Sequence, residues 1–220
     1  MLSEASQDEF ALLVNGKKRD GYWLELGGGP PEDYSNTYKL ETQYNWSGVT
    51  IDYNVKYAEM YKDKRPRTIG VFGVNCVSLN YLVLSEMTKL PKHINYLQID
   101  LEVSNDSTMK SLELIEKGLM CNSYEFAAVT FEHDWYAMKN GTTKDRSRAL
   151  FEKNGYQLIF PDVAVNAFPT RVFEDWYVSA ETFNSNPLLY EPIKESQHTY
   201  RKSRGPEGKY CIEMMNRTIV

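Results

Sequence analysis

Short apolar runs alternate with longer amphipathic runs along this chain of 220 residues, and this alternation constrains the fold more than any other feature. The short runs are typical of buried strands, and most of them are followed by a run with helical spacing of apolar residues. Such alternation predicts right-handed crossovers and a mainly parallel sheet, which belongs to the α/β class. The expected strands are residues 21–26, 47–53, 67–74, 94–102, 125–133, 157–163 and 171–178, and the expected helices are 36–46, 55–64, 79–90, 107–119 and 144–156.

The last two expected strands have no clear helix between them, so one of the two is expected to run antiparallel. The prediction is therefore a Rossmann-like, mainly parallel seven-stranded sheet with helices on both faces. We expect one domain over residues 1–183. Residues 184–220 are polar and are expected to form a C-terminal extension, either a flap or a packed tail.

Composition narrows the classes of partner. The formal net charge is -5, which argues against a nucleic-acid partner because phosphate contacts need a basic face. No apolar run approaches the roughly 18 residues of a membrane span, and the acidic N-terminus lacks the features of a signal peptide. Cys76, Cys121 and Cys211 are odd in number and far apart, so no disulfide framework is predicted. We expect a cytoplasmic protein, or a domain of a longer chain, without a nucleic-acid or membrane partner; the sequence leaves the oligomeric state open.

Three consecutive glycines, Gly27, Gly28 and Gly29, follow the first expected strand in "GYWLELGGGPPEDYSNTYKLE". Ligands of open α/β sheets bind beyond the carboxyl ends of the strands, and glycine lets the backbone approach a ligand closely. Asn36 and Thr37 lie at the start of the next expected helix, where backbone N–H groups are free. A ligand site is predicted here, although an ordinary tight turn would also explain the glycines.

The acids around these glycines indicate which ligand would bind. Glu25 would repel a phosphate but suits an amino group, and no G-x-G-x-x-G motif opens the helix directly. Asp52, with Tyr53 beside it, ends the second expected strand at a distance from Gly29 close to the ~20 residues typical of a ribose-binding carboxylate. A ligand with a ribose, an amino group and no phosphate corresponds to S-adenosylmethionine.

A second group of chemically active side chains follows the fourth and fifth expected strands. Because parallel strands bring their carboxyl ends together, these side chains are expected to converge on one rim. The group comprises Asp100, Glu102, Glu132, His133 and Asp134. His133 could act as a general base for a substrate hydroxyl, with the acids Asp100 and Glu102 beside it in the active site. Alternatively Asp100 or Glu102, together with Glu132 and Asp134, could hold Mg²⁺ or Mn²⁺ through oxygen ligands, or the acids could simply be solvated.

These segments resemble the FkbM-type S-adenosylmethionine-dependent methyltransferases from about residue 20 to residue 183. The most specific segments are "GYWLELGGG", "SNTYKLE", "YLQIDLEVSNDSTMKSLE", "FAAVTFEHDWY", "SRALFEKNGYQLIFPDV" and "FEDWYV". The resemblance implies a class I methyltransferase fold and O-methylation of a sugar hydroxyl in a glycan or glycosylated product, for example a terminal deoxysugar such as rhamnose. Relatives occur in bacteria and in large DNA viruses, and a viral protein would act in the host cytoplasm.

The resemblance also implies roles for individual residues. The cofactor would be bound by Glu25, Gly27, Gly28, Gly29, Asn36, Thr37, Asp52, Tyr53, Asn75, Cys76 and Asp100, with Asn75 and Cys76 beside the adenine. Asp100 and Glu102 match the family's I-D-x-E segment, and His133 matches its E-H segment. Two positions depart from the family pattern, since Pro31 and Val103 stand where glycine is usual, so the two loops are expected to follow different paths.

Two other functions remain open from the sequence. A nicotinamide-dependent oxidoreductase would retain NAD, but the glycine motif fits a dinucleotide poorly. A binding module could keep the fold without catalysis. The segment "VFEDWYV" around Trp176 is either an edge strand with packed aromatic residues or an aromatic wall for a sugar ring.

Overall fold

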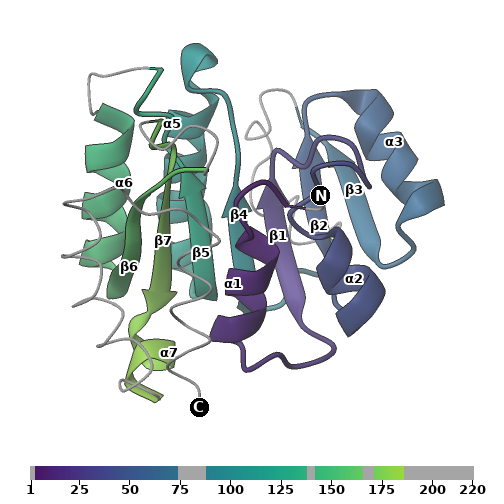
Figure 1. The fold of residues 1–220 in the computed structure, drawn as a ribbon, viewed down its shortest axis with the longest axis horizontal. Helices are drawn as coiled ribbons and strands as arrows, with labels where there is room; N and C mark the ends of the chain where they lie inside the picture. Colours follow the sequence, from purple (N-terminus) through teal and green to yellow (C-terminus); the bar gives the residue numbers. More distant parts are fainter. Residues whose placement is uncertain (1–2, 74–87, 138–141, 166–170, 186–220) are drawn as a thin grey trace.

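The computed structural model describes residues 3–73, 88–137, 142–165 and 171–185, which form a seven-stranded sheet with helices on both faces (Figure 1). The order of strands across the sheet is β3-β2-β1-β4-β5-β7-β6. The strands are β1 Tyr22–Leu26, β2 Ser47–Asp52, β3 Thr68–Phe72, β4 His93–Ile99, β5 Glu125–Glu132, β6 Tyr156–Val163 and β7 Glu174–Ser179.

Strands β1 to β5 pair in parallel, whereas β7 lies between β5 and β6 and runs antiparallel to both. This confirms the predicted α/β class and the expected antiparallel strand at that end. The inserted strand also distinguishes the sheet from the order 3-2-1-4-5-6 that is typical of dinucleotide-binding domains.

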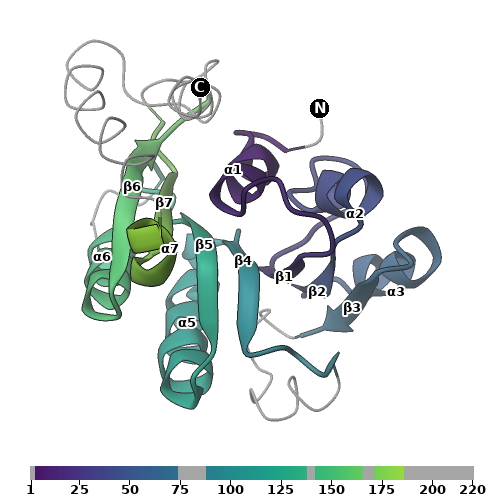
Figure 2. The ribbon, with the colours of Figure 1, turned by 90° about the horizontal axis from the view of Figure 1, so that it is seen from below.

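Figure 2 shows that the helices form two layers around the sheet. On one face lie α1 Gln7–Val14, α2 Tyr38–Tyr44 and α3 Val55–Lys64, and on the other lie α5 Ser107–Glu113 and α6 Thr142–Lys153. A short 3-10 turn, Val103–Asn105, precedes α5; a π-helical segment, Leu114–Leu119, and a 3-10 turn, Met120–Asn122, extend it, and α7 Ala180–Ser185 follows β7. None of the helices that the structure describes is long and apolar enough to cross a membrane.

The side-chain alternation of the strands divides the core into two layers. In β1, Trp23 packs into the layer under α1 and α2, whereas Leu24 and Leu26 pack into the layer on the opposite face. Trp176 of β7 is fully buried against Phe10 of α1, with ring centroids 4.8 Å apart. Its side chain is therefore part of the core, and the alternative of an aromatic wall for a sugar is wrong for this residue.

Helix α1 was not expected from the sequence. Its residues Phe10 to Val14 are all buried, so the helix lacks the polar face by which an amphipathic helix is recognised. Most of the expected helix 79–90, and the extension from residue 186 onward, lie outside the described residues, so the division into residues 1–183 and 184–220 stays a prediction.

Candidate functional site

A cavity of about 730 Å³ lies beyond the carboxyl ends of β1, β2, β4 and β5, at the edge of the sheet where a ligand was expected. Its volume is in the range of pockets for small organic ligands. The lining residues come from the glycine loop, the loops after β2, β4 and β5, and the start of α5. They include Gly27, Gly28, Gly29, Asp33, Tyr34, Asn36, Asp52, Tyr53, Tyr57, Asp100, Glu102, Glu132, Asp134 and Tyr136.

The glycine loop is held close to the neighbouring strands. Gly27 has a φ of +86°, and a Cβ atom there would lie 1.8 Å from the carbonyl oxygen of Asp100, so only glycine fits this position. Gly29 has a φ of +58°, and a Cβ there would meet nothing within 4 Å. The loop therefore opens toward free space at Gly29, which leaves room for a ligand to approach the backbone.

Asp52 links the glycine loop to the end of β2. Its carboxylate accepts hydrogen bonds from the backbone N–H groups of Gly29 (2.8 Å) and Asn54 (2.7 Å). Each oxygen keeps a second lone pair, and the residue lines the cavity beside the exposed ring of Tyr53. These groups could accept hydrogen bonds from ribose hydroxyls and stack on a nucleobase, and the ribose-binding role of Asp52 stays a prediction.

Glu25 lies beneath the glycine loop and does not line the cavity. Its carboxylate is 1% exposed and accepts hydrogen bonds from the hydroxyls of Thr50 (2.6 Å) and Thr37 (3.1 Å). Burial raises the pKa of Glu25 to about 7 despite those hydrogen bonds. In this arrangement Glu25 and Thr37 support the loop from below, and neither lines the cavity, although the Oε1 atom of Glu25 has no partner among the described residues. Their contact with a cofactor stays a prediction.

Asn36 bridges the two ends of the cavity. Its amide lies 3.5 Å from the Asp100 carboxylate, which it faces as a donor, and its Oδ1 atom is buried without a hydrogen-bond partner among the described residues. A buried acceptor without a donor is costly, so a donor from a ligand is expected at this position. The other predicted cofactor contacts, Asn75 and Cys76, lie outside the described residues.

At the far end of the cavity, Asp100, Glu132 and Asp134 form a row that we call the cavity cluster. Burial raises the pKa of Glu132 well above its usual value, and the nearby charges of Asp100 and Asp134, together with hydrogen-bonding contacts to both, raise it further. Burial also raises the pKa of Asp134, whose Oδ1 atom has no partner among the described residues. Glu102 lines the cavity nearby and is exposed.

The N-terminal segment adds a further carboxylate that the sequence analysis missed. The pKa of Glu4 is raised by partial burial and by the nearby charges of Asp100 and Asp134, so its side chain lies close to the cavity cluster. No sequence pattern links Glu4 to residues about 100 positions later; the packing of α1 on the sheet brings them together.

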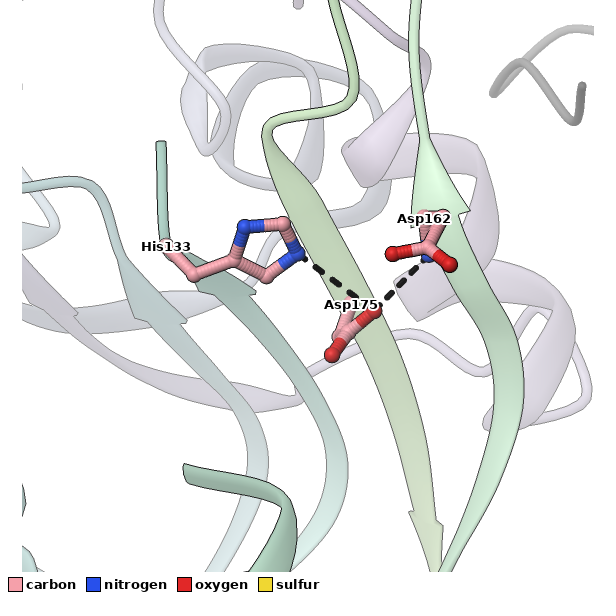
Figure 3. Close-up of side chains that lie close together, drawn as sticks. All are labelled: His133, Asp162 and Asp175. Atoms are coloured by element: carbon pink, nitrogen blue, oxygen red, sulfur yellow. Dashed lines mark hydrogen bonds and ion pairs between the residues drawn. The ribbon is translucent and has the colours of Figure 1, made fainter. Parts of the chain in front are cut away.

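His133 does not join the acids of the cavity cluster. Glu132 ends β5, and the next side chain points to the opposite face of the sheet because side chains alternate along a strand. The imidazole is fully buried, with its Nε2 atom 3.5 Å from Asp175 Oδ1, and it does not line the cavity (Figure 3). This position argues against the predicted role of His133 as general base.

Asp162, Asp175 and His133 lie close enough to hold a metal ion, but basic side chains already occupy the two acids. Arg148 donates to both oxygens of Asp175 (2.7 and 2.8 Å) and to Asp162 (3.0 Å), and Lys144 also pairs with Asp162. Burial would raise the pKa of Asp175, but the hydrogen bonds from Arg148 and His133 outweigh it and hold the pKa well below its usual value. We call these five residues the paired cluster and interpret it as a structural ion-pair network.

The metal ligands predicted from the sequence, Asp100, Glu132 and Asp134, are less closely grouped than His133, Asp162 and Asp175. Among the described residues, only His133, Asp162 and Asp175 bring three ligand atoms within 4.8 Å of one another. Asp100, Glu132 and Asp134 do not form such a compact set. Their binding of Mg²⁺ or Mn²⁺ stays a prediction.

The solved structures that resemble this fold include proteins named as methyltransferases. Human methyltransferase-like protein 13 in complex with SAH has a TM-score of 0.54 at 10% identity, over 98% of this chain and 90% of that chain. A TehB-like SAM-dependent methyltransferase from Corynebacterium glutamicum has a TM-score of 0.46 at 14% identity, over 78% and 86% of the two chains. M. jannaschii TYW2 in complex with AdoMet has a TM-score of 0.41 at 14% identity, over 81% and 78%.

No protein-family model matches the chain, and no curated protein sequence matches it either. The likeness to solved structures therefore concerns the fold. The strand order, the antiparallel β7 and the helices on both faces define a class I methyltransferase fold of Rossmann-like type.

Proposed function

We propose that this protein is an S-adenosylmethionine-dependent O-methyltransferase that acts on a sugar hydroxyl, as its resemblance to the FkbM-type family implies. The observation that carries the proposal is the joining of Gly29 and Asp52 by a hydrogen bond at the wall of a cavity, within a methyltransferase fold. This arrangement offers a ribose-binding carboxylate and an open backbone, but no phosphate cradle.

The cofactor end of the cavity would be formed by the glycine loop, Asp52, Tyr53 and Asn36. Asp52 would accept hydrogen bonds from the ribose hydroxyls, because its negative charge and its remaining lone pairs suit two donors. The unpaired Oδ1 of Asn36 would accept a further donor of the ligand. S-adenosylmethionine, when bound, supplies an electrophilic methyl group on a sulfonium, which suits a wall of carboxylates.

The acceptor end would be formed by the cavity cluster. In the proposed reaction an oxygen–methyl bond forms and a sulfur–methyl bond breaks, while the hydroxyl proton must pass to a base. Asp100 takes the place of His133 in this role, because it lines the cavity and is exposed there. A carboxylate within hydrogen-bonding reach of the hydroxyl can accept its proton as the methyl group is transferred.

Calorimetric titration with S-adenosylhomocysteine tests the cofactor class. Wild-type protein is expected to bind it, and Asp52→Asn is expected to bind at least about 10-fold more weakly because a charge-assisted contact to the ribose is lost. Asp63→Asn, on the exposed side of α3, is the charge-matched control and should bind as wild type does. Binding of NAD instead, or no difference between the two variants, would reject the proposed site.

The acceptor class is tested by mass spectrometry of glycans and glycosylated products incubated with protein and S-adenosylmethionine. A gain of one methyl group on a sugar oxygen would support the proposal. Methylation found only on nitrogen or carbon would overturn the O-methyltransferase assignment while leaving the cofactor class intact.

A further inference from the structure

The cavity is lined by more carboxyl groups than one cofactor explains. Six carboxylates line the cavity, on Asp33, Asp52, Asp100, Glu102, Glu132 and Asp134. None of the lining residues that the structure describes is Lys, Arg or His. S-adenosylmethionine has a sulfonium, an ammonium and a carboxylate, so it contributes only a single net positive charge.

The second observation is the unpaired oxygen of Asp134. This residue is 8% exposed and lines the cavity, and its Oδ1 atom has no hydrogen-bond partner among the described residues. Its carboxylate is in hydrogen-bonding contact with the Tyr136 hydroxyl and with Glu132. A buried charged acceptor without a donor is costly, so the free oxygen indicates where a ligand group must donate.

The third observation is the aromatic rim. Tyr34 and Tyr136 line the cavity and are 75% and 39% exposed. The face of a tyrosine ring attracts an organic cation and also covers the apolar face of a sugar ring. The guanidinium of Arg171 lies 6.0 Å from the Tyr136 ring, but Arg171 does not line the cavity.

We propose, on the basis of the proposed methyltransferase function, that the acceptor is a sugar with a protonated amino group, which Asp134 binds through its unpaired oxygen. Carboxylates and tyrosine faces together favour an ammonium group. They disfavour phosphorylated and carboxylated sugars, which the lining acids repel. A hard metal ion would need a compact set of oxygen ligands, whereas Asp100, Glu132 and Asp134 do not bring their ligand atoms within 4.8 Å of one another.

The test compares four probes by calorimetry in the presence of saturating S-adenosylhomocysteine: glucosamine, N-acetylglucosamine, glucose and glucose 6-phosphate. At a pH where the amine is protonated, glucosamine is expected to bind at least about 10-fold more tightly than N-acetylglucosamine. Glucose 6-phosphate is expected to bind most weakly. Equal binding of glucosamine and N-acetylglucosamine, or binding of neither, overturns the proposal.

Asp134→Asn is the informative variant. Asn tolerates the left-handed backbone that Asp134 adopts (φ 44°), so the variant is expected to fold. It should reduce the preference for glucosamine to less than about 2-fold, while Asp63→Asn keeps the wild-type preference. An unchanged preference in Asp134→Asn overturns the assignment of the ammonium group to this carboxylate.

Two further arms separate the causes of failure. If Mg²⁺ binds and displaces glucosamine, and Asp134→Asn abolishes the binding of Mg²⁺, the site belongs to a metal and the proposal falls. If S-adenosylhomocysteine does not bind, the proposed function falls, and the same comparison of probes on the protein alone decides the amine site separately.

Discussion

Two acidic clusters lie on opposite faces of the same edge of the sheet, and they differ in how their charge is balanced. The paired cluster places Asp175 and Asp162 against Arg148, Lys144 and His133. The cavity cluster places Asp100, Glu132 and Asp134 against one another, with Glu4 close by. The pKa of Asp175 is consequently lowered, whereas the pKa of Glu132 is raised.

This difference separates a structural role from a functional one. Buried charges that already have partners gain nothing from a ligand, whereas crowded acids facing a cavity gain a great deal from a cation. A group of acids with a histidine is therefore not enough to locate an active site. The decisive property is the balance of charge that remains after every protein partner has been counted.

The largest expected effect is on the stability of the paired cluster. Arg148→Ala should lower the free energy of unfolding by about 3 kcal/mol, because it leaves the fully buried Asp175 carboxylate without its bidentate partner. Urea denaturation followed by circular dichroism measures the change. Arg146→Ala, on the same helix, removes only an exposed 3.8 Å pair with Glu113 and should cost less than about 0.5 kcal/mol. Equal losses in the two variants would contradict the structural role.

The next effect concerns turnover and separates the two clusters directly. Asp100→Asn should lower turnover by at least about 100-fold, because the proposed base is lost. His133→Gln should keep turnover per folded molecule within about 3-fold. Turnover is measured as S-adenosylhomocysteine formed with the acceptor found in the screen. A loss in His133→Gln as great as in Asp100→Asn would return the base role to His133.

The pH dependence of stability should have opposite signs for the two clusters. Glu132 has a raised pKa, so its contribution to stability is complete below its ordinary pKa of 4.5 and is lost as the pH rises through its pKa in the folded chain. Asp175 has a lowered pKa, so its contribution is present above 3.8 and is lost as the pH falls through its folded pKa. Each unit of pKa shift corresponds to about 1.4 kcal/mol.

Denaturation of Glu132→Gln and Asp175→Asn at a series of pH values measures these contributions. Glu132→Gln should flatten the stability curve above pH 4.5, and Asp175→Asn should flatten it below pH 3.8. If both variants change the same limb of the curve, the two clusters do not differ in the way described.

The smallest expected effect is that of a divalent metal. Magnesium or EDTA should change the affinity for S-adenosylhomocysteine by less than about 2-fold, because the cavity cluster does not form a compact ligand set. Calorimetric titrations with Mg²⁺ and with EDTA measure this. A rise of about 10-fold with Mg²⁺ or Mn²⁺ that is lost in Asp134→Asn would favour the metal site instead.

Most strands and helices were predictable from the sequence, because their apolar residues follow a regular spacing and turn residues mark where each element ends. The position of Asp52 beside the glycine loop was also predictable, since it depends only on the spacing between two adjacent parallel strands. The orientation of His133 was not. It depends on which residue ends β5, and a shift of one position reverses the face to which a side chain points.

Two other features could not be predicted for different reasons. Every residue of helix α1 except Glu9 is buried, so its sequence has no helical alternation of polar and apolar residues. Glu4 lies near the cavity cluster only because α1 packs on the sheet, and such long-range contacts leave no local pattern. The position of Glu25 beneath the loop could not be predicted either, because it depends on hydrogen bonds from Thr37 and Thr50, which lie on separate elements.

The absence of a side chain at Gly27 has a mechanical consequence. Because the backbone of Gly27 lies so close to the carbonyl of Asp100, any side chain at this position would push the glycine loop away from the segment after β4 and disturb the contact between the two halves of the cavity. Substitutions that change substrate selectivity are expected at the rim, at Tyr34 and Tyr136, where exposed rings can be replaced without disturbing that contact.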